Sequence, residues 1–302
     1  MENWYEQAIK LKTMIDSSEA GSEIAEQIDV LEKALHTLKS GIDSTDKTGN
    51  SSEAHFNFTR EYYSGDRPDT IVTKGLTKIY GDYKANDDVS ITVKKGSIYG
   101  LIGRNGAGKT TWMKMLLGLT RADFGTVSFA GGAPKDVRRR IGYMIEEPCF
   151  YDSLTAYQNL MYRAKLIKIE NPEKAIDEAL EKTGIITKKN DKLKSFSLGQ
   201  KQMLGIASAI MGNPEILILD EPVNGLDPIA IVGVRKLLLD MNRSGVTIVI
   251  SSHILGELQK LATCYGFILQ GKLVKELSEE EIMTNEINLE DIFVNLAEGE
   301  LS

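Results

Sequence analysis

The feature that most limits how this 302-residue chain folds is the segment GRNGAGKT at residues 103–110. The apolar run SIYGLIG precedes it, and the run TTWMKMLLGL, which has the composition of a helix, follows it. A glycine-rich loop between a strand and a helix matches the pattern GxxxxGK[ST], in which backbone N–H groups and the positive end of the helix bind phosphate. The sequence therefore predicts a phosphate site at the end of a buried strand.

Each residue type in this segment has a part in binding a nucleoside triphosphate. Glycines let the backbone approach phosphate oxygens, Lys109 is long enough to reach the β and γ phosphates, and the Thr110 hydroxyl is a ligand for Mg²⁺. The candidate nucleotide-binding residues here are Gly103, Asn105, Gly106, Ala107, Gly108, Lys109, Thr110 and Thr111.

A second apolar run, ILILDE at residues 216–221, ends in two carboxylates. In an open α/β sheet such carboxylates emerge where a phosphate ligand lies. Asp220 suits a Mg²⁺ role through water, and Glu221 suits polarising an attacking water. Taken alone, two acids after a strand are equally consistent with a helix cap, but the phosphate loop upstream favours a catalytic role.

The rest of the main domain reads as an α/β fold. From Ile71 onward short β-rich runs alternate with helices, and EILILDEP and VTIVISSH are the continuous apolar runs of strands buried on both faces. Helices are predicted at 155–168 and 172–183, the second with Asn171 as its N-cap, Pro172 in its first turn and Gly184 at its exit.

The first 69 residues differ from this domain. Residues 1–40 repeat apolar positions in steps of three and four, which predicts a helical hairpin, and residues 41–69 are polar and predict a linker. Residues 1–69 hold 14 Asp and Glu against 7 Lys and Arg, which accounts for the whole net charge of −7. Both a docking element and a loosely attached tail are consistent with this pattern.

Composition excludes several classes of protein. The domain after residue 69 is electrically balanced, so no basic face for nucleic acid is predicted. No apolar run reaches the roughly 20 residues of a membrane span, so any such span must come from another chain. Cys149 and Cys264 lack metal-binding spacing, which favours reduced thiols, with no metal expected besides Mg²⁺.

The segment FSLGQKQ at residues 196–202 lies between the phosphate loop and ILILDE. In this order the motifs of residues 70–297 resemble those of the ABC ATPase family. The resemblance implies that Ser197 and Gly199 contact the γ-phosphate held by the loop of a second subunit, with Gln200 after them as a further nucleotide-binding residue. Leu198 departs from the family pattern, where glycine is usual.

Further positions are carried over from the same resemblance. Tyr80 matches the aromatic residue that stacks on adenine, NGLD at Asn224–Asp227 resembles the loop along the dimer seam, and His253 resembles the switch histidine that contacts the γ-phosphate. Glu146 stands where the family ordinarily has a glutamine that senses Mg²⁺ and the attacking water. The resemblance thus implies catalytic roles for Glu221, His253 and Glu146, and metal roles for Thr110, Asp220 and Glu146.

The family further implies a fold and a set of partners. We expect a mixed sheet core, an antiparallel β subdomain and a helical subdomain at about 148–200 within residues 70–302, preceded by an N-terminal helical extension. We expect ATP and Mg²⁺ as cofactors, a homodimer or heterodimer of ATPase subunits, and a polytopic membrane permease as partner at the cytoplasmic face of the membrane.

The acidic residue at position 146 and the phrases FYDSLTAYQNL and LDEPVNGLDP resemble the bacterial exporters that give self-protection against lantibiotics and bacitracin-type peptides. The family places the contact with the permease near Phe150, Tyr151 and the helix of residues 155–165. Three alternatives remain: a soluble non-transport ABC ATPase, a subunit that binds without hydrolysing, and an ABC-2 exporter subunit for a non-peptide substrate.

Overall fold

The computed structural model describes residues 67–130, 132, 137, 140–146, 148–284 and 288–299. The predicted helical hairpin of residues 1–40 lies outside this part of the chain, as does the predicted linker of residues 41–69 except for its last three residues. Within the described residues, no helix is both long enough and apolar enough to span a lipid bilayer.

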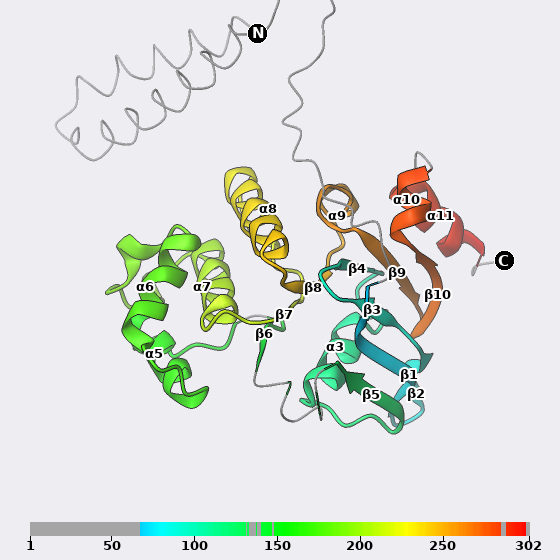
Figure 1. The fold of residues 1–302 in the computed structure, drawn as a ribbon, viewed down its shortest axis with the longest axis horizontal. Helices are drawn as coiled ribbons and strands as arrows, with labels where there is room; N and C mark the ends of the chain where they lie inside the picture. Colours follow the sequence, from blue (N-terminus) through cyan, green and yellow to red (C-terminus); the bar gives the residue numbers. More distant parts are fainter. Residues whose placement is uncertain are drawn as a thin grey trace, which may run out of the picture. The chain divides into compact units, whose positions relative to one another are not determined.

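A small antiparallel sheet opens the described chain (Figure 1). Its long strand β1 (Asp69–Tyr80) pairs with β2 (Tyr83–Val89), β3 (Thr92–Lys94) and β5 (Phe124–Phe129). A two-residue turn joins β1 to β2, and Gly81 in this turn has a φ of 59°, which glycine adopts without steric cost. The turn pairs Tyr80 with Tyr83 across the hairpin.

The second sheet has six strands in the order β10-β9-β4-β8-β7-β6. All neighbouring pairs are parallel except β9 and β10, so the sheet is mixed, as the family resemblance implies. The strands are β4 (Ile98–Ile102), β6 (Ile141–Met144), β7 (Ile216–Leu219), β8 (Thr247–Ser251), β9 (Cys264–Leu269) and β10 (Lys272–Leu277).

The central strands are apolar throughout because both faces of this sheet are covered. In β7, Leu217 and Leu219 join one apolar cluster while Ile216 and Ile218 join the other, as the two-residue period of a strand requires. One cluster contains the helices of the C-terminal half, and the other lies with α3 and the antiparallel sheet. The carboxyl ends of β4, β7 and β8 therefore open at one edge of a rigid, buried sheet.

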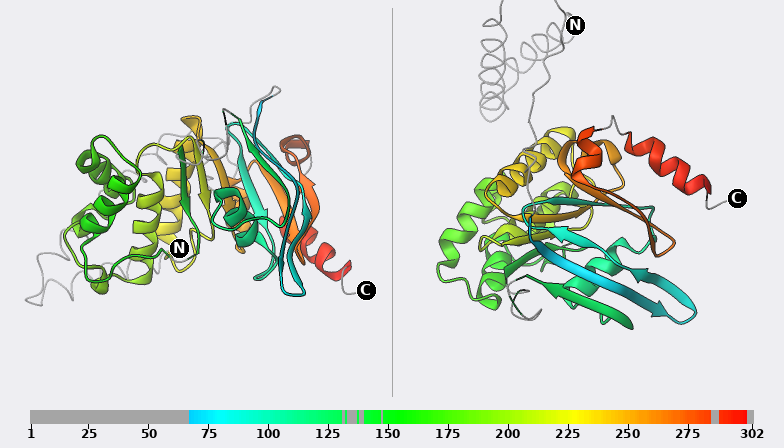
Figure 2. Two further views of the ribbon diagram at one scale, coloured as in Figure 1. Left: turned by 90° about the horizontal axis from the view of Figure 1, so that it is seen from below. Right: turned by 45° about the vertical axis from the view of Figure 1, so that its right-hand side comes forward.

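The helices that cover the sheets are seen from two further directions in Figure 2. They are α3 (Lys109–Leu117), α5 (Ala156–Leu166), α6 (Pro172–Lys182), α7 (Leu198–Ile210), α8 (Pro228–Arg243), α9 (Leu255–Leu261), α10 (Glu279–Thr284) and α11 (Leu289–Gly299), with short 3₁₀ helices η2 (Ile186–Lys188) and η3 (Leu193–Ser195).

Helices α5, α6 and α7 gather beside β6 (Figure 1). Thr155 and Gln158 form a capping box at the start of α5, which satisfies backbone donors that the first turn leaves unpaired. Pro172 begins α6 and Gly184 follows it with a φ of 72°, but the predicted cap Asn171 makes no side-chain capping hydrogen bond. The helical segment predicted to end near residue 200 continues along α7 to Ile210.

Candidate functional site

The phosphate loop joins β4 to α3 and ends at Gly108, directly before the first residue of the helix. Gly108 has a φ of 107°, and a Cβ added there would overlap the carbonyl oxygen of Ala85. Only glycine meets both conditions, because other residues rarely adopt this conformation and need space for a side chain. The loop is thereby held against β2, with the N–H groups of the first turn of α3 at its end.

Lys109 is a buried cation whose partners are mostly neutral. Its side chain is 6% exposed, and Nζ donates to the carbonyl oxygens of Gly103 at 2.6 Å and Arg104 at 3.3 Å. The carboxylate of Glu221 lies 3.6 Å from Nζ. Carbonyl oxygens compensate a buried charge less fully than an anion does, so this ammonium group is suited to receive phosphate oxygens.

A chain of three hydrogen-bonded side chains lies below the loop. The Thr110 hydroxyl donates to Oδ2 of Asp220 at 2.6 Å, and the Ser251 hydroxyl donates to Oδ1 of the same carboxylate at 2.6 Å. Asp220 is only 4% exposed, and its N–H donates to the carbonyl of Met144 at 2.8 Å. Both carboxylate oxygens are therefore oriented by neighbours from α3 and β8.

Glu221 has a partner at each carboxylate oxygen, but only one of the two oxygens is hydrogen-bonded. Its Oε2 accepts from the N–H of His253 at 3.1 Å and lies 2.7 Å from Nδ1 of the same residue. Its Oε1 is buried and has no hydrogen-bond partner among the described residues. Gln202 donates to the backbone carbonyl of Glu221 at 3.0 Å. The carboxylate is thus hydrogen-bonded through Oε2, while Oε1 lies beside the Lys109 ammonium group and can still accept a hydrogen bond from a water or ligand.

The loop, the two acids and two tyrosines enclose one cavity of about 420 Å³. Tyr80 and Tyr83 form its outer wall and are 51% and 55% exposed, so Tyr80 is not a core tyrosine. Tyr83 also donates its hydroxyl to the carbonyl of Gly106 at 3.0 Å. The lining residues are Tyr80, Tyr83, Ala85, Arg104, Asn105, Gly106, Ala107, Gly108, Lys109, Thr110, Thr111, Asp220 and Glu221.

The segment around Ser197 lies apart from this cavity. Ser197 and Gln200 form a capping box at the start of α7, in which the Ser197 hydroxyl accepts from Gln200 N at 3.2 Å. Neither they nor Gly199 line the cavity. Leu198 is 57% exposed, and its Cδ2 lies 2.9 Å from where a Cβ on Gly225 would stand. The helix start therefore contacts the NGLD loop of its own chain.

Glu146 also lies outside the cavity lining. It follows β6 in a left-handed conformation, with a φ of 58°, and its Oε1 lies 2.7 Å from Nζ of Lys114 on α3. The structure thus brings together Lys109, Thr110, Asp220 and Glu221, and His253 contacts Glu221. Glu146 is instead paired with Lys114, one turn of α3 beyond Thr110.

The donor set suits a hard divalent cation. Mg²⁺ prefers oxygen ligands and takes one or two carboxylates together with phosphate oxygens. The Thr110 hydroxyl and the Asp220 carboxylate are such ligands, and they already lie in contact beside the phosphate loop. In the described part of the chain, this site included, no group of three or more His, Cys, Asp or Glu residues is placed to hold a metal by itself.

Sequence reasoning missed three residues of this site. Tyr83 and Asn86 reach the phosphate loop from β2, where Asn86 donates to the carbonyl of Gly108 at 3.3 Å. Ser251 orients Asp220 from the end of β8. A signal for Ser251 was present, because it is a polar residue at the end of an apolar strand, directly before the segment that carries His253.

Comparison with known proteins agrees with this geometry. Residues 86–224 match the protein family described as ABC transporter. The bacitracin transport ATP-binding protein of Bacillus licheniformis is 48% identical over 212 residues, which cover 68% of this chain and 69% of that protein. This chain belongs to the ATP-binding subunits of ABC transporters. It is an ATP-hydrolysing subunit, and ATPase subunits of ABC transporters work with a membrane permease and dimerise.

Two further likenesses extend over most of the ATPase domain. A lantibiotic transport ATP-binding protein of Streptococcus pyogenes is 42% identical over 224 residues, covering 74% of this chain and 95% of that protein. A solved ATP-binding subunit of an ABC transporter superposes with a TM-score of 0.68 and 26% identity, covering 76% of this chain and 99% of the other. The predicted family and ABC-type α/β fold are confirmed.

Proposed function

We propose that this ABC ATPase subunit powers the export of an antimicrobial peptide of the bacitracin or lantibiotic type, for immunity or resistance. The observation that carries the catalytic part is the placement of Lys109, Thr110, Asp220 and Glu221 around one cavity at the start of α3. The peptide class is supported by the relatives, whose names are bacitracin and lantibiotic transport proteins.

Each residue of the cavity has a defined task in this proposal. Lys109 and the loop amides bind the phosphates, and Tyr80 and Tyr83 offer flat faces to the base. Thr110 and Asp220 hold Mg²⁺, which supplies charge neutralisation at the phosphates when bound. Glu221 accepts a hydrogen bond from the attacking water through Oε1, while His253 fixes the opposite oxygen of the same carboxylate.

A complete site requires a second protomer. Ser197, Gly199 and Gln200 lie outside the cavity of their own chain, and the backbone N–H groups at the start of α7 are donors suited to phosphate oxygens. We propose that these groups close the cavity of the partner protomer. Homodimers and heterodimers both satisfy this requirement.

Glu221→Gln tests the catalytic assignment. The amide keeps the size of the side chain but removes the negative charge, so ATP should bind while hydrolysis falls by at least about a hundredfold. The dimer should then persist with ATP and Mg²⁺, as size-exclusion chromatography with light scattering would reveal. Glu215→Gln is the matched control, because Glu215 is exposed and pairs with Arg140 away from the cavity. Normal turnover in the Glu221→Gln protein would refute the assignment.

The permease should contact the helices that follow Glu146, at the cytoplasmic face of the membrane. Phe150, one of the residues expected there, is partly buried against the core. Tyr151 and Tyr162 instead present exposed rings, 58% and 60% exposed, packed edge to face with centroids 6.0 Å apart. Exposed aromatic pairs are typical anchors of protein interfaces. We therefore place the contact at Tyr151 and Tyr162.

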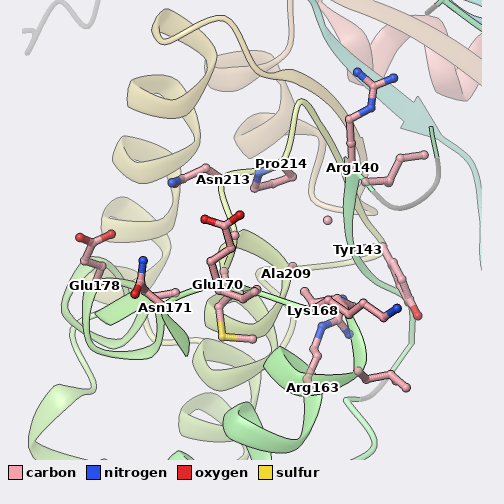
Figure 3. Close-up of a pocket in the computed structure, with 18 of the residues that line it drawn as sticks. Arg140, Tyr143, Arg163, Lys168, Glu170, Asn171, Glu178, Ala209, Asn213 and Pro214 are labelled. Carbon is pink, nitrogen blue, oxygen red and sulfur yellow. The ribbon is translucent and has the colours of Figure 1, made fainter. Parts of the chain in front are cut away.

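A cavity of about 570 Å³ lies between the end of α5, the start of α6, β6 and the end of α7 (Figure 3). Arg163 lies on one wall with its guanidinium 4.8 Å from the ring centre of Tyr143, and burial lowers its pKa. Lys168 and Glu170 line the same cavity. A helix of the permease that places an acidic side chain near Arg163 fits this lining.

Removing the aromatic pair tests this contact. Tyr151→Ala combined with Tyr162→Ala should abolish copurification with the permease and peptide resistance of the host, while ATPase activity of the isolated subunit remains. Phe124→Ala is the control, since Phe124 is 65% exposed on β5, in the antiparallel sheet. Unchanged copurification of the double variant would overturn the proposed surface. Unchanged bacitracin and lantibiotic susceptibility after loss of the wild-type subunit would overturn the peptide assignment alone.

A further inference from the structure

Glu146 and Lys114 form an ion pair that the catalytic assignment leaves unexplained. The pair joins the loop after β6 to α3, with Oε1 of Glu146 2.7 Å from Nζ of Lys114. The Glu146 side chain is 60% exposed and the Lys114 side chain 29%. Glu146 is thus held by a cation outside the nucleotide cavity rather than at the cavity wall.

Lys114 lies on the same face of α3 as Thr110. The two residues are four positions apart, a spacing at which helical side chains are neighbours. Thr110 contacts Asp220, which we assign to Mg²⁺, so Lys114 lies one turn beyond the proposed metal site. The Glu146 carboxylate must therefore break its ion pair with Lys114 before it can contact Mg²⁺.

The backbone of Glu146 adds a second reason to expect two positions. Its φ of 58° is in the left-handed region, which is unfavourable for a residue with a Cβ. Such conformations persist where surrounding contacts hold them, and they often mark segments that switch. The ion pair with Lys114 is one contact that holds this one.

The same loop is packed tightly against α7. Gly205 has no side chain, and a Cβ added there would overlap Cγ of Pro148 and lie 2.6 Å from Sδ of Met144. Met144 and Pro148 stand on the two sides of Glu146 in the chain. A movement of α7 that carries Ser197 toward a partner protomer must therefore also displace the backbone on either side of Glu146.

We propose that Lys114 is a positioning residue that holds Glu146 away from the metal site until nucleotide binds and α7 moves. This inference rests on the proposed function and on the Mg²⁺ role that the family resemblance implies for Glu146. The release of Glu146 from Lys114 is then coupled to the movement of α7, because the loop that carries Glu146 is also the loop that packs against α7. The ion pair favours the position of Glu146 at Lys114 over its position at the metal site. Exposed ion pairs of this kind shift such an equilibrium by about two- to fivefold.

The test is a binding experiment on the intact nucleotide-free protein. A fluorescent ATP analogue is titrated with and without Mg²⁺ into wild type, Lys114→Met, Glu146→Gln and the double variant. We expect Lys114→Met to tighten Mg²⁺-dependent binding by about two- to fivefold and to leave binding in EDTA unchanged. The gain should vanish in the Glu146→Gln background, and Lys114→Arg should behave as wild type.

Three outcomes separate the inference from its premise. If Lys114→Met weakens binding equally with and without Mg²⁺, Lys114 acts as a general phosphate attractant and the proposal is overturned. If Glu146→Gln changes the Mg²⁺ dependence but Lys114→Met changes nothing, the holding role alone fails. If Glu146→Gln has no effect on the Mg²⁺ dependence, the proposed metal role of Glu146 fails.

Two controls complete the experiment. Lys236→Met removes an exposed lysine on α8, and its nucleotide binding should match that of wild type. This variant controls for the positive charge that Lys114→Met removes. Amide hydrogen exchange of Ile145, Glu146 and Cys149 without nucleotide should be faster in Lys114→Met than in wild type. Equal exchange rates would contradict a holding role without reference to nucleotide at all.

Discussion

Replacing Ser251 by alanine should damage the nucleotide site out of proportion to the single oxygen removed. Ser251 is fully buried at the end of β8. Its hydroxyl donates to Oδ1 of Asp220 at 2.6 Å and accepts from the backbone N–H of Glu221 at 2.9 Å. One hydroxyl thus positions both acids that follow β7.

The expected loss of stability follows from these two bonds. A hydrogen bond to a charged group contributes about 1.5 to 3 kcal/mol, and a buried N–H left without a partner costs about 1 to 3 kcal/mol. Asp220 keeps its bond from Thr110, so we expect Ser251→Ala to lower the free energy of unfolding by about 3 kcal/mol. For a domain of this size the melting temperature should fall by roughly 6 to 12 °C.

The neighbouring Ser252 provides the control. It is 1% exposed, but within the residues that the structure describes its hydroxyl accepts one hydrogen bond, from the N–H of Ile254 at 2.9 Å. Ser252→Ala should therefore cost about 1 kcal/mol. Urea unfolding measures both variants, and a Mg²⁺ titration of ATPase activity should show a higher half-saturating concentration for Ser251→Ala only. Equal loss of stability in the two variants, with unchanged Mg²⁺ dependence, would refute this account of the site.

Three further measurements address the loop, a thiol and a carboxyl group. Gly108→Ala should weaken ATP binding more than tenfold in an equilibrium titration, because its added Cβ overlaps a backbone carbonyl, whereas Gly106→Ala meets no atom within 4 Å and carries only the strain of its φ of 82°, so it should weaken binding less. Burial raises the pKa of the Cys264 thiol to about 12, so maleimide at pH 8 should modify the exposed Cys149 and spare Cys264 until the protein is unfolded, as mass spectrometry would reveal. Partial burial raises the pKa of Glu276 above its ordinary value of 4.5, so stability from this group is complete below that value and is lost as the pH rises through the raised pKa. Glu276→Gln should then raise the melting temperature at pH 7 and not at pH 4.

The phosphate loop and the two acids were predictable because their chemistry is local in the sequence. A glycine-rich turn followed by Lys109 and Thr110 needs only the adjacent strand and helix to form a phosphate site. Asp220 and Glu221 leave β7 at the same sheet edge, since the register of the parallel strands aligns their carboxyl ends. The order of the strands in the sheet was not needed to predict that the phosphate loop and the two acids lie together. It was enough that these strands are buried and parallel.

Tyr83, Asn86 and Lys114 could not be predicted in the same way. Tyr83 and Asn86 reach the loop only because β2 folds back on β1 in one particular register and then passes under Gly108. Lys114 meets Glu146 only because α3 and the loop after β6 lie next to each other. These contacts depend on the packing of distant elements, and residue type alone does not encode that packing.

Gln202 links α7, the helix that we propose contacts the nucleotide of a second protomer, to Glu221, which acts on the nucleotide of its own protomer. It lies on α7, one turn beyond Ser197 and Gly199, and donates to the backbone carbonyl of Glu221 at 3.0 Å. Glu221 has a φ of 49°, a conformation that a residue with a side chain keeps only while its neighbours hold it. A shift of α7 on dimer closure therefore acts on the backbone that aims Oε1. This contact gives a physical reason why hydrolysis in the cavity of one protomer should depend on how α7 of that protomer contacts the cavity of its partner.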